Sequence, residues 1–336
     1  MTIRDSAKYA LKAVSNLHRQ GDRPNVFLFA TARGGSTWVM EILASQPGVK
    51  YYDEPFNIRR DNVARTGLFP NWESLMPDTD DPARIVSFLN GLVSGEYPHM
   101  NPPPFRPFHR LMTDRIVFKI HELEHLVGRI ARECHGQVVY LLRHPVPTTQ
   151  SRAVLPRLHL FLASSYYADI VGDGRRLRDI RRIGTEGTKL QKGVVSWCYE
   201  NLIPLTRPDF EGLFVTYEEL VLNPERSCDL FLERLHFADR EKMLQAFHTP
   251  AANISMSSAV RQAEMARTDP RDRAISLVSK WQATLTDGDR RAVNEIMELF
   301  GLDVYSADRV LPHARYLHFD DTAARLGSEH GVGSAP

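Results

Sequence analysis

The residues Val26-Phe-Leu-Phe-Ala-Thr-Ala-Arg-Gly-Gly-Ser-Thr-Trp-Val-Met-Glu-Ile-Leu43 combine a strand, a turn and a helix start. The apolar run from Val26 to Ala30 predicts a buried strand, and Val39, Ile42 and Leu43 have the spacing of one face of an amphipathic helix. Gly34-Gly35 lies between them and is typical of a tight turn. A turn into a helix N-terminus presents unpaired backbone N–H groups and the positive end of the helix dipole. The sequence therefore predicts an anion-binding loop.

Three side chains strengthen this prediction. Arg33 adds a permanent cation, and Ser36 and Thr37 add hydroxyl donors. The loop of ATP- and GTP-binding proteins requires Gly-x-x-x-x-Gly-Lys-[Ser/Thr]. Here Gly35 takes the place of that Lys, and the first Gly is missing. The ligand is thus expected to carry a phosphate-like group, but the loop is not that of a standard nucleoside triphosphate site.

Further apolar runs predict a sheet interleaved with helices. Strand, helix and strand alternate at the spacing of βαβ units, which favours an α/β fold with a mostly parallel sheet. Residues 156–203 are expected to be mostly helical, with a break from Gly172 to Gly193. The last helix is expected to be capped by Thr286 and closed by Gly301. Strands are expected at 49–52, 115–120, 138–142 and 213–217, and helices at 5–19, 83–93, 121–134, 227–235 and 286–300.

Composition indicates an ordinary globular chain. Its 336 residues are 43% hydrophobic and 25% charged. The formal net charge of +1 gives no general affinity for nucleic acid or membranes. The three cysteines form no Cys-x-x-Cys pair, no run is long enough to cross a membrane, and the N-terminus lacks an apolar signal core. We therefore expect a cytoplasmic protein without a disulfide framework or a transmembrane segment.

We expect one domain over residues 1–336. Two less regular segments, about 57–112 and 156–193, are expected to be insertions that form the acceptor side of the site. The first is rich in proline and has few core-forming residues, which predicts a surface segment or a lid. The small and polar residues 322–336 are expected to fray.

The loop resembles that of the sulfotransferases that use 3′-phosphoadenosine 5′-phosphosulfate (PAPS). Their loop is [Lys/Arg]-x-Gly-[Ser/Thr]-[Ser/Thr]-[Trp/Phe], and Arg33-Gly34-Gly35-Ser36-Thr37-Trp38 matches it at every position. The resemblance implies a P-loop-like three-layer fold, in which a central, mostly parallel sheet is flanked by helices. It also implies that these six residues hold the 5′-phosphosulfate end of PAPS.

A second motif resembles the same family. Its members hold the 3′-phosphate with an Arg at a strand end and a Ser eight residues later on the next helix, and Arg143 and Ser151 have that spacing. An Arg offers a bidentate fork to phosphate, and a Ser at a helix start would add a hydroxyl. The stretch 214–225 and the segment from Trp281 to Leu302 also resemble the family. In that family a basic C-terminal loop covers the 3′-phosphate. The residues of this chain that could belong to such a loop are Arg261 and Arg267.

The resemblance implies two cations near the moving sulfuryl group. Arg33 stands where the family has a Lys that serves the leaving group, and Lys119 matches a Lys that reaches the sulfuryl oxygens. Because Arg is a good electrostatic clamp and a poor proton donor, we expect Arg33 to stabilise the leaving group without protonating it.

Two residues compete for the role of general base. Lys119-Ile120-His121 resembles the pattern of the cytosolic sulfotransferases, which implies that His121 is the base. Tyr52-Asp53-Glu54-Pro55 resembles the Glu-Pro signature of the carbohydrate sulfotransferases, which implies Glu54. The lead-in Gln46-Pro47-Gly48-Val49 also resembles the carbohydrate branch, so the sequence favours Glu54 and leaves His121 open.

The run His121-Glu-Leu-Glu-His125 satisfies the zinc-protease pattern His-Glu-x-x-His. Residue 131, where a third His would extend this motif, is Ala131, and Lys119 beside the motif would repel Zn²⁺. We therefore predict that the motif is coincidental and that the site has no metal.

These features together predict an enzyme that moves a sulfuryl group from PAPS to an acceptor hydroxyl and releases 3′,5′-diphosphoadenosine (PAP). The Glu-Pro resemblance implies that the acceptor is a carbohydrate, a glycolipid or a glycosylated natural product. The alternatives are a nucleotide-dependent phosphotransferase and an inactive regulatory protein that binds PAP or PAPS. The sequence leaves the oligomeric state open, a homodimer included. Aromatic residues that could face an acceptor are Phe56, Trp72, Phe105, Phe108, Tyr166 and Tyr167.

Overall fold

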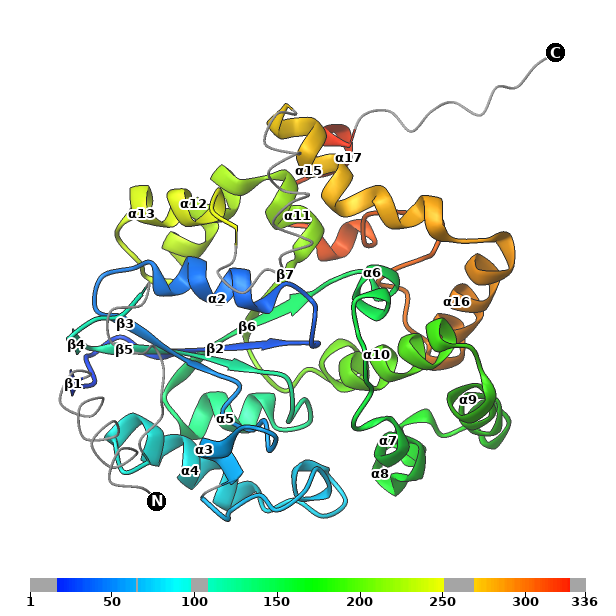
Figure 1. The fold of residues 1–336 in the computed structure, drawn as a ribbon, viewed down its shortest axis with the longest axis horizontal. Coiled ribbons are helices and arrows are strands. Elements are labelled where there is room, and N and C mark those ends of the chain that lie inside the picture. The colour runs from blue at the N-terminus through cyan, green and yellow to red at the C-terminus, as the bar shows by residue number, and fades with distance from the viewer. Residues whose placement is uncertain (1–16, 65, 98–107, 251–268, 327–336) are drawn as a thin grey trace.

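The computed structural model describes residues 17–64, 66–97, 108–250 and 269–326. Within these ranges the chain is an α/β protein whose main sheet is parallel and five-stranded and lies between layers of helices (Figure 1). The strand order is β3-β5-β2-β6-β7, which confirms the predicted fold class and the parallel sheet. The strands are β2 (Asn25–Ala30), β3 (Val49–Asp53), β5 (Arg115–Ile120), β6 (Gly136–Leu142) and β7 (Gly212–Thr216).

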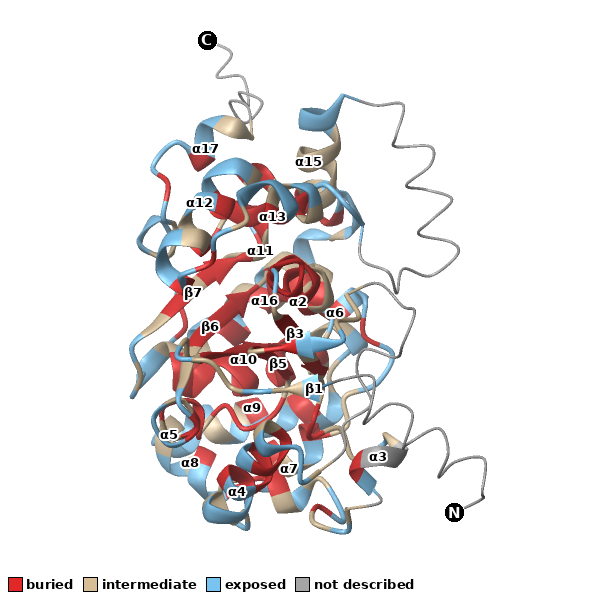
Figure 2. Cartoon of the chain, turned by 90° about the vertical axis from the view of Figure 1, so that its left-hand side faces the viewer, coloured by how far each residue is buried: buried red, intermediate tan, exposed pale blue. Residues whose placement is uncertain are grey.

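The central strand β2 shows why the sheet is covered on both faces. Val26 and Leu28 lie in one buried cluster, whereas Phe27 and Phe29 lie in the other. Because successive side chains of a strand point to opposite faces, an apolar run without alternation requires helices on both sides. Phe27 stacks on Phe118 of β5 with a ring separation of 4.9 Å, and Figure 2 shows the strands as buried between the helices.

Two groups of helices cover the two faces (Figure 1). Those that pack on the Val26 face are α2 (Ser36–Ala44), α11 (Tyr217–Leu222), α12 (Pro224–Leu235) and α13 (Arg240–Phe247). Those that bury residues in the Phe27 cluster are α3 (Asp61–Ala64), α4 (Pro82–Ser94), α5 (Val127–Glu133), α6 (Pro145–Gln150), α7 (Leu158–Ala163), α8 (Ser165–Val171), α9 (Gly174–Glu186), α10 (Lys189–Thr206) and α16 (Asp287–Phe300). The other elements are α15 (Pro270–Ser279), α17 (Thr322–Arg325), the short strands β1 (Leu17–His18) and β4 (Met112–Thr113), and 3₁₀ turns at Glu73–Leu75, Lys280–Thr284 and Ala314–Tyr316.

The prediction of a helix at 121–134 is wrong for the first half of this range. Residues 121–126 form a loop, and α5 begins only at Val127. Leu123 has a left-handed backbone with φ of 64°, which a continuing helix cannot contain. The expected break from Gly172 to Gly193 is also wrong, because α9 fills most of it. Asp173 caps α9 through its carboxylate, which accepts from the backbone N–H groups of Arg175 and Arg176.

Residues 57–112 contribute to the core, so the expectation of a surface segment is wrong for their middle part. Phe69 and Phe88 are buried and pack edge-to-face with each other and with Phe56. The hydrophobic pattern does not reveal these core residues, because prolines and polar residues separate the buried positions. The predicted helix at 83–93 is present as α4, capped by Asp81.

Predictions near the two ends have mixed outcomes. Residues 1–16 lie outside the described ranges, but Leu17 and His18 pair with β4 as a strand, so the helix expected at 5–19 does not reach 19. The capping box at Thr286 and the left-handed Gly301 confirm the predicted ends of α16. It is not the last helix, because α17 follows. Residues 327–336 of the expected frayed tail lie outside the described ranges.

The cysteines Cys134, Cys198 and Cys228 are buried free thiols. Across the described ranges, no helix combines the length and the apolar character needed to cross a membrane.

Candidate active site

The loop after β2 depends on two glycines. Gly35 has a φ of 93° and occupies the N-cap position of α2, and a Cβ there would lie 2.5 Å from a ring carbon of Tyr217. The backbone N–H of Gly34 donates to the carbonyl of Thr31 at 2.9 Å, and a Cβ on Gly34 would lie 2.8 Å from that oxygen. Any larger side chain would therefore open the turn, which agrees with the predicted tight loop before the helix.

The sheet order brings the two predicted anion motifs together. β2 and β6 are neighbours, so the loop at Arg33 and the segment from Arg143 to Ser151 follow adjacent strand ends. The Arg33 Nε donates to the Ser151 Oγ at 3.0 Å, and the Arg143 Nη1 donates to the Arg33 carbonyl at 3.1 Å. Residues separated by 118 positions thus form one cationic corner at the carboxyl edge of the sheet.

Arg143 has donors left to bind a ligand. Its guanidinium stacks on the ring of Tyr217 at 4.1 Å, and its buried Nε has no hydrogen-bond partner in the described chain. Within the same residues no carboxylate forms an ion pair with it. A planar fork held in place by stacking, with free donors, fits a phosphate group. The predicted helix-start position of Ser151 is wrong, because Ser151 caps the C-terminal end of α6 and offers only its hydroxyl.

The remaining loop residues divide between the site and the core. The Thr37 Oγ1 accepts from the Lys119 Nζ at 3.2 Å, and the Ser36 Oγ lies 3.5 Å from the His121 Nε2. Trp38 packs edge-on against Tyr217 and Phe247, with ring separations of 5.8 and 5.7 Å. The hydroxyls of the loop therefore connect it to the end of β5.

Lys119 joins this loop to the acidic end of β3. Asp53 is the register partner of Lys119, and the Lys119 Nζ lies 2.5 Å from the Asp53 Oδ1 and 3.0 Å from the Glu54 Oε1. The Arg60 Nη2 meets the other oxygens of the same carboxylates, at 2.7 Å from Asp53 and 3.2 Å from Glu54. Sequence reasoning identified neither Asp53 nor Arg60 as a site residue. Asp53 could have been identified from its position next to Glu54, whereas nothing in the sequence pointed to Arg60.

These contacts leave Glu54 as a stabilised carboxylate. Burial alone would raise its pKa, but the hydrogen bond with His121 and the charge of Lys119 outweigh burial and hold the pKa well below its usual range. The Asn57 Nδ2 also donates to the Glu54 Oε2 at 2.7 Å. Such a carboxylate is a weak proton acceptor.

His121 has one ring nitrogen fixed and the other turned to the site. Its Nδ1 lies 2.6 Å from the carbonyl oxygen of Ala30, which can only accept, so Nδ1 carries a proton. Its Nε2 lies 3.4 Å from the Glu54 Oε1. A proton taken up by Nε2 would face a carboxylate, so the geometry stabilises the imidazolium that a general base becomes.

Glu122 follows His121 and has a contrasting environment. It is buried, and its Oε2 accepts from the backbone N–H of His121 at 3.2 Å. Burial raises the pKa of the Glu122 carboxyl, because the nearby charges of His121 and Arg157 do not offset the loss of hydration. Sequence reasoning noticed Glu122 only as part of the zinc-protease pattern.

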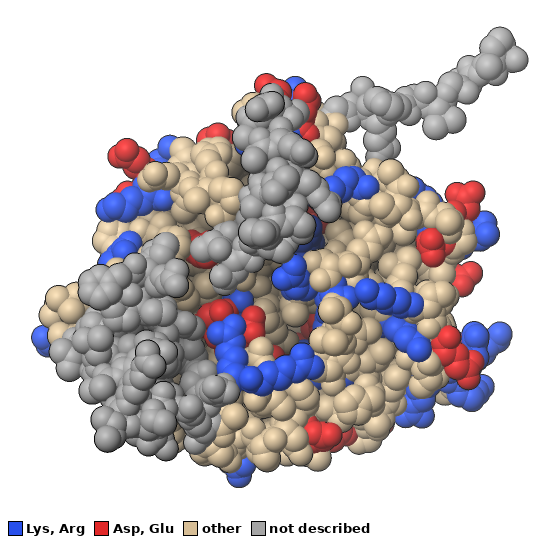
Figure 3. Space-filling view, in the orientation of Figure 1, with Lys and Arg blue, Asp and Glu red and all other residues tan. Residues whose placement is uncertain are grey.

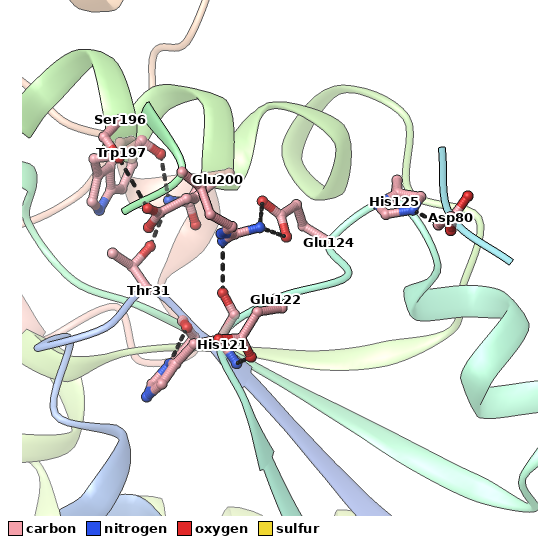
Figure 4. A network of polar contacts seen from close by, with 12 residues as sticks. Thr31, Asp80, His121, Glu122, Glu124, His125, Ser196, Trp197 and Glu200 are labelled. Atoms are coloured by element: carbon pink, nitrogen blue, oxygen red, sulfur yellow. Dashed lines mark hydrogen bonds and ion pairs between the residues drawn. The ribbon is translucent and has the colours of Figure 1, made fainter. Parts of the chain in front are cut away.

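The zinc-protease pattern has no helix to support it. His121 and His125 lie in the loop before α5, and the His125 Nε2 pairs with Asp80 at 2.9 Å (Figure 4). No group of three or more His, Cys, Asp or Glu side chains is placed to hold a metal ion in the described ranges. The absence of a metal from the working protein stays a prediction.

A cleft of about 350 Å³ joins the cationic corner to His121. Acidic and basic side chains gather side by side near the middle of the face drawn in Figure 3. Of the aromatic candidates, Trp72 lines the cleft, Phe56 and Tyr167 belong to the core, and Phe105 lies outside the described ranges, as do Arg261 and Arg267. The lining residues are Ala32, Arg33, Glu54, Asn57, Arg59, Trp72, His121, Glu122, Ser151, Arg152, Ala153, Val154, Pro156, Arg157 and Glu200.

Comparisons with known proteins give only distant similarities. No protein-family model and no curated protein matches this chain. Among solved structures it is similar to the sulfotransferase domain of the Synechococcus PCC 7002 olefin synthase, with 17% identity over 86% of this chain and 100% of that one and a TM-score of 0.41.

Two further structures are similar at the same distant level. The mouse sulfotransferase SULT7A1 complexed with PAP is 13% identical over 90% of this chain and 91% of that one, with a TM-score of 0.39. A retinol dehydratase in complex with androsterone and inactive cofactor PAP is 14% identical over 90% and 88%, with a TM-score of 0.32. At these values the function must be argued from the residues of the site.

Proposed function

We propose that this chain is a sulfotransferase that moves the sulfuryl group of PAPS to an acceptor hydroxyl. The observation that carries the proposal is the meeting of Arg33, Ser151 and Arg143 at one corner, with Lys119 and His121 beside it. A ligand with two anionic ends would find donors for both, and the transferable group would lie next to a candidate base.

In the proposed reaction, a bond forms between the acceptor oxygen and sulfur as the bond from sulfur to the 5′-phosphate oxygen breaks. The acceptor proton passes to the enzyme, and PAP leaves. We propose that the Nε2 of His121 accepts this proton. The sequence favoured Glu54 as the base, but the carboxylate of Glu54 already pairs with the cations Lys119 and Arg60. Glu54 then stabilises the charged imidazole. A base of this kind acts only as the new bond forms.

We propose that Lys119 and the backbone N–H groups at the start of α2 stabilise the negative charge that develops during the transfer. Lys119 lies between Thr37 and the acidic pair Asp53 and Glu54, which fixes the position of its ammonium group. Arg33 turns its Nε to Ser151, so we propose that it binds the anionic nucleotide and does not protonate the leaving group.

We propose that the acceptor occupies the cleft beside His121. Asn57, Arg59 and Trp72 line it from the first irregular segment, and Pro156 and Arg157 from the second. This supports the expectation that both segments form the acceptor side. An aromatic face and several hydrogen-bonding groups suit a sugar, a glycolipid or a glycosylated natural product. Three free cysteines fit a reducing cytoplasm.

A phosphotransferase is the second candidate, and the electrostatics of the site oppose it. Such an enzyme needs carboxylates that hold Mg²⁺ beside the phosphates. Here Lys119 and Arg60 already occupy the oxygens of Asp53 and Glu54. We expect transfer to survive EDTA, and a complete loss that Mg²⁺ restores would favour the phosphotransferase. Failure to consume PAPS with any acceptor in a broad panel would instead favour an inactive binding protein.

The test of the nucleotide assignment is Arg143→Ala. We expect it to weaken PAP binding about 10- to 100-fold, because charge-assisted hydrogen bonds to the 3′-phosphate are lost. Binding of 5′-AMP, which lacks that phosphate, should barely change. Isothermal titration calorimetry with both nucleotides measures the difference, and equal losses for the two would refute the 3′-phosphate assignment.

A further inference from the structure

We infer that Arg157 is a positioning residue for His121, and that the buried pair Arg157–Glu124 sets the orientation of the base. This inference rests on the proposed function, in which His121 receives the acceptor proton. Arg157 is buried immediately before α7, and Glu124 lies in the loop that begins with His121. Neither residue belongs to the motifs that resemble those of the sulfotransferases.

The guanidinium of Arg157 bridges two groups of the loop. Its Nη1 donates to both oxygens of Glu124 at 3.0 Å, and its Nη2 donates to the backbone carbonyl of His121 at 2.8 Å. The same group packs over the ring of Phe161 with a separation of 4.9 Å. Because a guanidinium is planar, fixing it at Glu124 and Phe161 also fixes the donor that holds His121.

The base is therefore held at three points. The Nδ1 donates to Ala30, the backbone N–H donates to Glu122, and the backbone carbonyl accepts from Arg157. The contacts at the N–H and the carbonyl hold the peptide groups on both sides of the residue, which directs its side chain towards the end of β2. Without the Arg157 contact the carbonyl is free to turn, and the Nδ1–H to Ala30 contact that exposes Nε2 loses its support.

The surrounding network shows that this contact is not a general feature of the core. Arg152 and Glu200 of α10 form a similar buried pair at 2.8 Å, but in the part of the chain that the structure describes neither forms a hydrogen bond with His121. Arg157 alone among the described arginines donates to the backbone of the proposed base. A lysine at 157 would keep a positive charge beside Glu124 but lacks the planar fork that reaches both partners.

Arg115 provides a matched control, because it lies on β5, the strand that precedes His121. It is fully buried at the opposite end of β5, where its guanidinium also holds backbone carbonyls, those of Pro24 and Leu235, at 2.6 Å each. Arg115→Lys removes a buried guanidinium fork as Arg157→Lys does, but far from the site. The two variants separate loss of packing from loss of positioning.

The experiment compares Arg157→Lys with Arg115→Lys in the full chain. For Arg157→Lys we expect kcat to fall by up to about 10²-fold, a change in the pH profile of kcat, and an unchanged Kd for PAP. For Arg115→Lys we expect a lower melting temperature with kcat near that of the wild type. The direct readout is the ¹⁵N spectrum of histidine-labelled protein, with the His121 signals assigned from a His121→Asn variant. Arg157→Lys should remove the signature of a protonated Nδ1.

Unchanged His121 ring signals in Arg157→Lys would overturn the inference. A fall in kcat that is the same in both variants, in proportion to the folded fraction, would overturn it as well. The ring signals require no turnover, so they test the positioning even if no sulfuryl transfer is found. A wild-type protein with the fixed Nδ1–H but without transfer would refute the proposed function and leave the positioning intact.

Discussion

The carboxyl ends of β3 and β5 are neighbours in the sheet, and each is followed by a glutamate beside the site. Glu54 meets Lys119, Arg60 and His121, and its pKa lies well below the usual range. Glu122 has no ion pair with a cation of the described chain, and burial raises its pKa. The pKa values of two glutamates on adjacent strand ends are thus shifted in opposite directions.

The difference teaches that the neighbours of a carboxyl group, more than its position at a strand end, set its chemistry. The sequence offered Glu54 as a base because of its place before a proline. The cations around it stabilise its charged form, which supports His121. Glu122, which no sulfotransferase motif marks, is the one of the two glutamates whose pKa burial raises.

The sharpest test of this comparison is to remove each candidate base. His121→Ala should lower kcat by about 10²–10⁴-fold, because the proton acceptor is lost. Glu54→Gln should lower kcat only about 10-fold, since it removes the charge that supports the imidazolium. Steady-state transfer with a saturating acceptor measures both, and PAP binding should stay near that of the wild type. If Glu54→Gln is the more damaging change, then Glu54 is the base.

The next test removes Lys119, the cation that pairs with both Asp53 and Glu54. Lys119→Ala should lower kcat by about 10²–10³-fold, because it takes a fixed positive charge from the reacting group and removes one of the two cations that Asp53 and Glu54 share in the described chain. Lys50→Ala is the control, since Lys50 is also buried but lies near the start of β3. Equal losses of kcat in the two variants would mean that Lys119 acts through stability alone.

The smallest expected effect concerns stability and pH. The raised pKa of Glu122 means that folding favours its protonated form, so its ionisation costs stability as pH rises above the ordinary value of 4.5. Glu122→Gln should therefore raise the melting temperature at pH 8 by about 1–3 °C, with no gain at pH 4.

Glu54→Gln should behave in the opposite way. The lowered pKa means that the stabilisation by its charge is present above 4.5 and is lost only as pH falls through the folded-state value. The variant should be less stable than the wild type at pH 7 and approach it in acid. Differential scanning calorimetry across this range checks both variants, and parallel pH profiles would contradict the contrast.

Much of the fold was predictable because its signals are local. The apolar runs predicted all five strands of the sheet, and the glycines and Thr286 predicted the turn and the last capped helix. The errors arose at single residues whose backbone conformation or capping role the hydrophobic pattern does not show. At Leu123 the left-handed backbone interrupts the expected helix, and at α9 a capping Asp173 starts a helix where the basic, glycine-flanked sequence indicated a break.

The sequence by itself determined the strands, the glycine loop, and the identity of the candidate residues Arg33, Glu54, Lys119, His121 and Arg143. These follow from side-chain size, hydrophobic period and charge, which are properties of neighbouring residues. Only the tertiary structure decided which of them meet. Asp53 and Arg60 join the site around Lys119 and Glu54, Arg157 holds His121, and Glu122 forms no ion pair within the described ranges. The physical reason is that protonation depends on burial and on charges within a few ångströms, and the order of strands in the sheet sets those distances.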